Sequence, residues 1–136
     1  MRNQRKAIMR NIAHLTILYV GERARGRLLR AAAQGRGWHV YLPTETLEAL
    51  GMYIFYYPDL VVLDAFSEAT LAAEVGAHLC SIQADSLLVV TDNTRQDPWH
   101  DLALASRRVL PSTASASEVV TAVMDLVESH VMAYAT

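Results

Sequence analysis

The sequence predicts a three-layer α/β domain, in which a doubly wound, five-stranded parallel sheet lies between two layers of helices. Two observations support this prediction. Five short apolar runs, rich in β-branched residues, alternate with segments of helical length. The runs are also apolar at most successive positions, as strands covered by helices on both faces must be. The chain of 136 residues is long enough for one such domain.

The predicted strands follow one another at regular intervals. They are "LTILYV", "WHVYLP", "PDLVVLD", "SLLVVTD" and "RRVLPS", which span residues 15–20, 38–43, 58–64, 86–92 and 107–112. Helices are expected between and after them, over residues 23–34, 44–57, 67–82, 98–105 and 117–130. The order of elements is therefore strand, helix, strand, helix throughout, with a final helix.

The first helix is rich in arginine and alanine and ends at the Gly-Arg-Gly sequence of residues 35–37. We expect Leu28, Ala31 and Ala32 to form its buried stripe and its arginines to lie on a solvated face. The segment "GMYIFYY" (residues 51–57) places six large apolar or aromatic residues in succession. A helix buries only one stripe, so some of these rings must face outward, toward a protein partner, a covering loop or the N-terminal extension.

Charge divides the chain into two unlike parts. Residues 1–36 hold nine of the twelve cationic side chains and one acid, so they carry +8, and the remaining residues carry −10. We expect residues 1–14 to be a basic N-terminal extension, 15–131 the domain and 132–136 a short tail. The sequence lacks a membrane-spanning apolar run and a signal peptide, which predicts a cytoplasmic protein without a membrane partner.

Polar residues follow the predicted strands at one edge of the sheet. Ligands of doubly wound sheets bind outside the carboxyl ends of the strands. Gly21 and Glu22 come after the first strand, and Asp64 ends the third. Thr91 and Asp92 come at the end of the fourth strand, and Ser112 and Thr113 at the end of the fifth. We expect these residues to converge on one candidate site.

Four segments resemble, in order, the receiver domain of bacterial response regulators in two-component signalling. They are "ILYVGE", "PDLVVLDAF", "LLVVTDN" and "VLPSTASASEVVTAV". The spacing agrees as well, because Asp64 lies 42 positions after Glu22 and Thr91 lies 27 positions after Asp64. The resemblance covers roughly residues 15–130 and implies a flavodoxin-like strand order, 2-1-3-4-5.

The resemblance assigns roles to three residues of the candidate site. Asp64 matches the phosphoacceptor aspartate, and Thr91 matches the switch hydroxyl. Glu22 matches the second acid of the pair that holds magnesium, so Glu22 and Asp64 are the expected metal ligands. Such a site would bind magnesium weakly if at all, and no cofactor is required.

Three other positions depart from the pattern of the family. Gly21 stands where the first acid of the pair belongs, and glycine has no ligating side chain. The lysine position falls on Ser112, or on Leu110 in a different alignment, and Lys6 is the only lysine of the chain. Val109 stands where many receivers carry an aromatic ring. We therefore expect a degenerate receiver, or pseudo-receiver, without the cation that contacts the phosphoryl group.

The expected function is that of a signalling module that binds other proteins, with weak or no phosphorylation of Asp64. Its expected partner is a histidine kinase, an output protein or a second copy as a homodimer. One alternative is a working phosphoacceptor receiver of a two-component phosphorelay. Another is binding of nucleic acid or an acidic partner through the arginine-rich first 36 residues, although no recognisable nucleic-acid reader follows them. Independent enzyme activity is not expected, because no P-loop, dinucleotide fingerprint or triad spacing is present.

Overall fold

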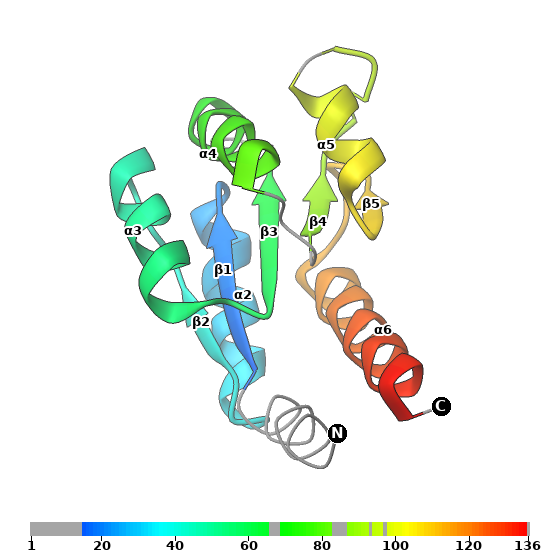
Figure 1. The fold of residues 1–136 in the computed structure, drawn as a ribbon. Coiled ribbons are helices and arrows are strands. Elements are labelled where there is room, and N and C mark those ends of the chain that lie inside the picture. The colour runs from blue at the N-terminus through cyan, green and yellow to red at the C-terminus, as the bar shows by residue number, and fades with distance from the viewer. Residues whose placement is uncertain (1–14, 66–68, 83–86, 93, 97, 136) are drawn as a thin grey trace.

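The computed structural model describes residues 15–65, 69–82, 87–92, 94–96 and 98–135. Its parallel strands form one sheet of five in the order β2-β1-β3-β4-β5, so the predicted fold class and strand order are confirmed (Figure 1). The strands are β1 (Thr16–Val20), β2 (His39–Tyr41), β3 (Leu60–Asp64), β4 (Leu87–Val90) and β5 (Arg108–Leu110). The helices are α2 (Arg23–Gln34), α3 (Thr46–Tyr56), α4 (Ala69–Ile82), α5 (Trp99–Ala105) and α6 (Ala116–Ala135).

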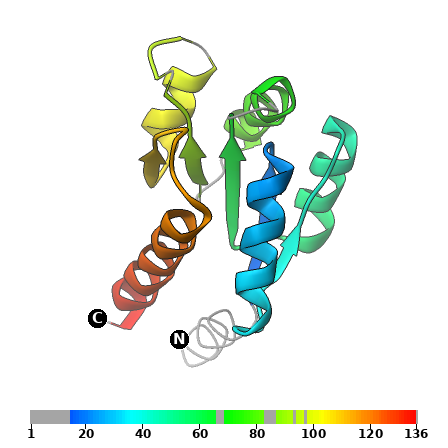
Figure 2. The same ribbon diagram turned by 180° about the vertical axis from the view of Figure 1, so that it is seen from behind.

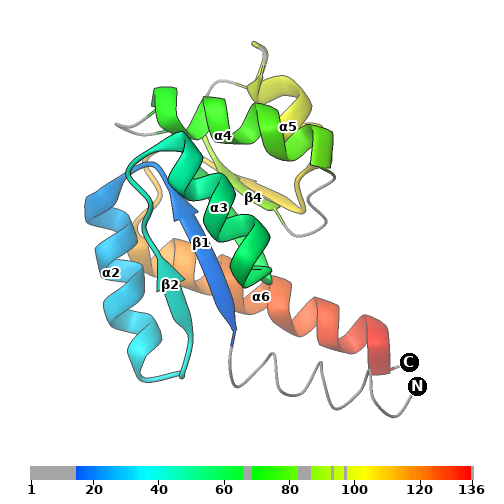
Figure 3. The ribbon, with the colours of Figure 1, turned by 60° about the vertical axis from the view of Figure 1, so that its left-hand side comes forward.

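Helices cover both faces of this sheet. The α2 and α6 helices lie on one face, which Figure 2 shows from the front, and α3, α4 and α5 lie on the other (Figure 3). Successive strand residues alternate between the two apolar cores, because side chains of a strand point to opposite faces. Ile17 and Tyr19 of β1 belong to the core under α2 and α6, whereas Leu18 and Val20 belong to the other core.

The same alternation sets the direction of Asp64. Val62 of β3 packs in the core under α2 and α6, and Leu63 packs in the opposite core. Asp64 therefore shares the face of Val62. Tyr19 pairs with Val62 in the parallel register, so Asp64 lies two residues beyond Tyr19 on the same face of adjacent strands. A tyrosine ring can span that offset.

The buried stripe of α2 differs from the expectation by one residue. Gly26, Leu29 and Ala33 are its buried residues, whereas Leu28 is 58% exposed and Ala31 and Ala32 are exposed. Gly26 allows the helix to lie close to the sheet. A Cβ atom there would be 2.5 Å from Leu42 Cδ2 and 3.1 Å from Tyr19 Cδ1. The first turn of α2 is thus held tightly above the end of β1.

The ends of the chain depart from the expected division in one respect. The α6 helix continues to Ala135, so residues 132–135 belong to this helix and not to a separate tail. The predicted N-terminal extension, residues 1–14, lies outside the described residues. Among the described residues, no helix combines the length and the apolar character needed to cross a bilayer.

One residue within α3 and one directly after it lower stability without an evident internal reason. Gly51 lies in the middle of the helix, and a Cβ atom there would meet nothing within 4 Å. Glycine at such a position costs about 1 kcal/mol relative to alanine. Tyr57 follows the helix with φ of 47°, in the left-handed region that glycine normally occupies. For a residue with a side chain this conformation costs about 1–2 kcal/mol.

Candidate functional site

Asp64 is the centre of the candidate site, and its carboxylate is already bound by two side chains of the same chain. The Tyr19 hydroxyl donates a hydrogen bond to Asp64 Oδ2. The Arg25 guanidinium places Nη1 3.4 Å from both carboxylate oxygens. Asp64 is fully buried, and the Arg25 side chain is only 12% exposed. The acceptor position is therefore covered by a phenol and a cation.

Arg25 reaches Asp64 because it lies in the first turn of α2, above the carboxyl ends of β1 and β3. Glu22 is the N-cap of this helix, and its Oε1 accepts a hydrogen bond from Ala24 N at 3.0 Å. Arg25 precedes the buried residues Leu29 and Ala33 at intervals of four, which places it on the inward side of the helix. The close approach at Gly26 brings this side within reach of the sheet.

The Arg25–Asp64 ion pair is close to energetic balance. At 3.4 Å and an effective dielectric constant of about 20, two unit charges attract by about 5 kcal/mol. Removing each ion from water costs several kcal/mol, so formation of the pair adds little net stability. Loss of either partner is different, because the remaining charge stays buried without compensation. The arrangement thus favours keeping both charges in place.

Burial raises the pKa of Tyr19 far above its usual value of 10, and the negative charge of Asp64 raises it further. The phenol therefore stays protonated and donates to Asp64 at every physiological pH. Because the folded-state pKa is the higher one, this contribution to stability is complete below pH 10 and decreases as pH rises above it.

We expect Tyr19→Phe to lower the free energy of unfolding by about 1.5–3 kcal/mol at neutral pH, because Asp64 loses a hydrogen bond to its charged oxygen. Above pH 10 the stability of the variant should also decrease less steeply with pH than that of wild type. Urea unfolding at neutral and alkaline pH measures both effects. Tyr57→Phe is the matched control, since Tyr57 is 83% exposed, and it should keep the wild-type alkaline slope. Equal slopes for wild type and Tyr19→Phe would contradict the assignment.

Gly21 occupies a position that no other residue can fill in this backbone. Its φ is 127°, and a Cβ atom there would lie 1.9 Å from the backbone oxygen of Asp64. The first acid of the receiver pair is therefore absent, and the packing of β1 against β3 also excludes its return. No ligand for a metal ion can come from the side chain at this position.

Ser112, the residue at the lysine position, binds the loop after β4. Its amide donates to Asp92 Oδ1 at 2.9 Å, and its hydroxyl donates to Asp92 Oδ2. These hydrogen bonds, the one from the hydroxyl above all, hold the pKa of Asp92 below its usual range. Thr91 beside it is buried, and its amide donates to Leu110 O at 2.9 Å. Ser112 thus joins two loops at the carboxyl edge and supplies no cation to Asp64.

The residues at this edge do not fit the magnesium site that the resemblance implies. Magnesium requires near-octahedral oxygen ligands. Gly21 offers no side-chain ligand, Asp64 is engaged by Tyr19 and Arg25, and Glu22 Oε1 caps α2. Within the part of the chain that the structure describes, no cluster of three or more histidine, cysteine or acidic residues could hold a metal ion.

Sequence reasoning missed Tyr19 and Arg25, the two residues that define this site. A signal for Arg25 was present, because residues 25, 29 and 33 form an i, i+4, i+8 series that ends in apolar residues. Tyr19 had no such signal, because it lies inside an apolar run like an ordinary core residue.

Comparison with solved structures identifies the fold that contains this site. A response regulator receiver domain from Clostridium thermocellum superposes with a TM-score of 0.66 at 12% identity, covering 85% of this chain and 96% of its own. The response regulator TrrA from Thermotoga maritima, solved with Mg²⁺ and BeF, gives 0.63 at 22% identity, with 82% and 98% covered. The chain has the receiver-domain fold.

One further similar structure is a redox sensor. A redox sensor of the streptococci, from a family evolved from two-component response regulators, gives a TM-score of 0.68 at 16% identity, with 85% of this chain and 52% of that chain covered. No protein-family model and no curated protein sequence matches the chain.

Proposed function

We propose that this chain is a receiver-fold signalling module that acts through protein contacts while its aspartate pocket stays closed. One observation carries the proposal: fully buried Asp64 is bound by Arg25 and Tyr19 of the same chain. In this proposal Arg25 replaces the magnesium ion and the lysine of a working receiver with a single resident cation. Asp64 then serves as an internal ion-pair partner and is phosphorylated weakly or not at all.

The electrostatics of the pocket support this proposal. A phosphoryl group on Asp64 would bring a charge of about −1.5 to −2 into a buried site. Arg25 supplies one positive charge, Gly21 cannot help to hold a metal, and Ser112 is neutral. Attack by Asp64 on a phosphoryl donor would also require Arg25 and the Tyr19 hydroxyl to leave its oxygens. Both requirements disfavour the phosphorylated state relative to that of a receiver with an open acidic pocket.

Incubation with acetyl phosphate and magnesium, followed by intact-mass spectrometry, tests the proposal. Wild type and Asp64→Asn should give the same spectrum, without a phosphoryl adduct. TrrA from Thermotoga maritima serves as the positive control for reagent and conditions. An adduct on wild type that is missing from Asp64→Asn would overturn the proposal in favour of a working phosphoacceptor.

A further inference from the structure

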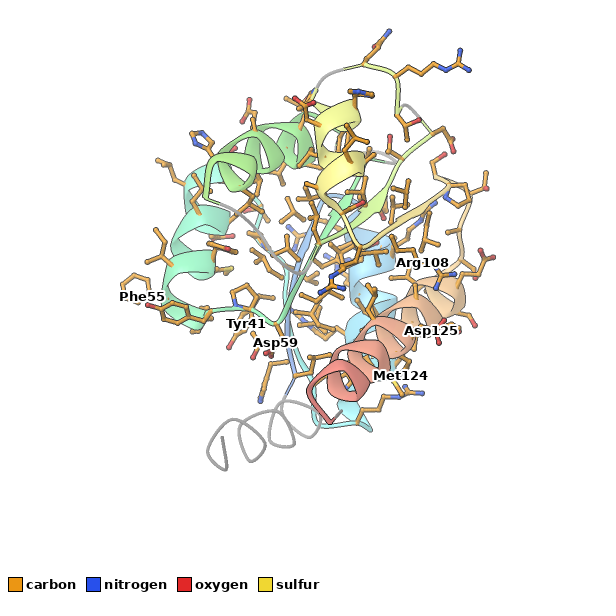
Figure 4. All side chains as sticks on the ribbon, turned by 45° about the vertical axis from the view of Figure 1, so that its right-hand side comes forward. Tyr41, Phe55, Asp59, Arg108, Met124 and Asp125 are labelled. Carbon is orange, nitrogen blue, oxygen red and sulfur yellow. The ribbon has the colours of Figure 1, made fainter. Side chains whose placement is uncertain are left out.

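The outward face of α3 is an apolar surface that the rest of the described chain leaves uncovered. Leu47 and Phe55 are each 82% exposed, Ile54 is 60% exposed, and Tyr57 at the helix end is 83% exposed. Figure 4 shows Phe55 projecting away from the domain. Leu47, Gly51, Ile54 and Phe55 follow one another at spacings of four, three and one, which places them on one side of the helix. We call these four residues, together with Tyr57, the α3 patch.

The inner side of α3 is anchored separately, so the α3 patch is not required for folding of the domain. Ala49 is buried in the core of this face, and Met52 and Tyr53 pack against that core. Tyr56 stacks on Tyr41 of the edge strand β2, with ring centroids 4.3 Å apart and planes 8° from parallel. A surface helix normally has polar residues opposite such an anchored side. The outward side of α3 is apolar instead, which is typical of a helix that has a second packing partner.

Two members of the α3 patch carry local costs that such a partner would explain. Gly51 lies mid-helix with open space where a Cβ atom would be, so nothing inside the described chain requires glycine there. Tyr57 adopts the left-handed conformation with its ring exposed, although glycine would relieve the strain. Strained residues that persist in this way mark sites of function. A glycine between larger residues lets another helix approach closely, and an exposed tyrosine supplies contact area at low entropic cost.

We propose that the α3 patch binds the α3 patch of a second copy of this chain, with the two helices antiparallel and crossing at Gly51. This geometry sets Leu47 of each copy against Ile54 and Phe55 of the other, so that larger side chains flank a shared notch. Residues 49–58 carry no charged side chain, and two copies can meet there without repulsion. Glu48 accepts a hydrogen bond from Thr44 N at 2.8 Å, and antiparallel pairing keeps the two Glu48 carboxylates at opposite ends.

The size of the α3 patch agrees with a symmetric pair. Taking about 150–200 Å² for each fully exposed large side chain, its exposed apolar area is on the order of 500 Å² per copy. Two copies would bury on the order of 1,000 Å², near the lower limit for a specific interface. A patch of this size is also as large as the largest apolar patch of a typical monomer, which is often functional. The expected dimer is therefore of moderate affinity and depends on concentration.

Sedimentation equilibrium of the full chain across micromolar concentrations tests the inference. Wild type should be a monomer–dimer equilibrium, and Phe55→Ser should weaken dimerisation at least about tenfold, because an aromatic residue central to an interface contributes strongly. Tyr57→Gly should weaken the dimer as well, yet raise the melting temperature measured at low concentration by about 3–5 °C. That opposite pair of changes excludes unfolding as the cause of a lost dimer.

Leu104→Ser is the matched control, since Leu104 is an apolar residue of α5 that is 75% exposed and lies outside the α3 patch. It should dimerise like wild type. A monomeric wild type, a dimer that survives Phe55→Ser, or equal loss of the dimer in Leu104→Ser would each overturn the inference. The inference rests on the proposed function in that it names the partner of a protein-contact module. The two fail separately, because the acetyl phosphate test at Asp64 is independent of Phe55.

Discussion

Arg25→Met should lower the free energy of unfolding by about 3 kcal/mol, one of the two largest effects expected for single substitutions in this chain. The variant keeps the hydrogen bond from Tyr19 to the fully buried Asp64 but removes the positive charge of Arg25. Breaking a buried ion pair by removing one partner costs about 3–5 kcal/mol. We expect the lower end of this range, because the ion-pair distance is 3.4 Å and Arg25 retains some exposure. Urea unfolding monitored by circular dichroism gives the value.

Two further variants identify the cause of that loss. In the double variant Arg25→Met/Asp64→Asn neither charge of the ion pair remains, so it should recover most of the stability, and the double-mutant cycle gives the coupling energy. Arg23→Met, which changes an exposed arginine of the same helix turn, should alter stability by less than about 0.5 kcal/mol. Equal losses from Arg23→Met and Arg25→Met would show that helix α2 matters and the ion pair does not.

Gly21→Asp should destabilise the domain by more than about 4 kcal/mol, although it would restore the first acid of the receiver pair. The new Cβ atom would be 1.9 Å from the Asp64 backbone oxygen, and φ of 127° is unfavourable for any side chain. Gly21→Ala should cost nearly as much, because the clash arises at Cβ. Thermal unfolding of the purified variants, or their yield as soluble protein, measures the effect.

Gly35→Ala is the matched control for both Gly21 substitutions. Gly35 has φ of −70°, and a Cβ atom there would meet nothing within 4 Å, so alanine should be tolerated. A stable Gly21→Asp variant that binds magnesium would show that the backbone at Gly21 can relax. The present closure of the site would then be a matter of side chains alone.

The fold could be predicted from the sequence because its signals are local and repeated. Each strand is an apolar run, and each run is separated from the next by a helix-length segment. Parallel pairing then follows because each helix returns the chain to the edge of the sheet at which the previous strand began. The position of Asp64 at the carboxyl edge was predictable for the same reason. The motif positions of Gly21 and Ser112 also predicted that the first acid and the lysine of a receiver are missing.

Tyr19 and Arg25, which bind Asp64 in place of the missing receiver groups, could not be predicted in the same way. Their contacts depend on the exact rotation of α2, and the sequence pattern of that helix suggested a stripe containing Leu28 in place of the actual Leu29. Because the predicted stripe was displaced by one residue, Arg25 was expected on the solvated side of the helix, whereas it lies on the inward side. Tyr19 was hidden for another reason, because a tyrosine inside an apolar run looks like an ordinary core residue. Only the register of β1 against β3 places its hydroxyl at Asp64.

The α3 segment shows the opposite case, in which composition alone was informative. The "GMYIFYY" segment predicted outward-facing aromatic residues, and Phe55 and Tyr57 are indeed exposed. The charged surface of β5 and α6 is a weaker candidate for self-association. Arg108 of β5 and Asp125 of α6 already form an exposed ion pair with each other at 3.2 Å (Figure 4). Such a pair adds little stability, and its charges are partly satisfied within the chain. The uncharged α3 patch is the stronger candidate for self-association.

Titration with magnesium and beryllofluoride, a phosphoryl mimic, tests the closed aspartate pocket most directly. The backbone amides of Asp64, Ala65 and Thr91 are followed by NMR in wild type and in Asp64→Asn. Closure by Arg25 and Tyr19 predicts no saturable shift in either protein at millimolar magnesium. Saturable shifts in wild type that vanish in Asp64→Asn would contradict it, and would show that Asp64 can release both partners and receive a phosphoryl group.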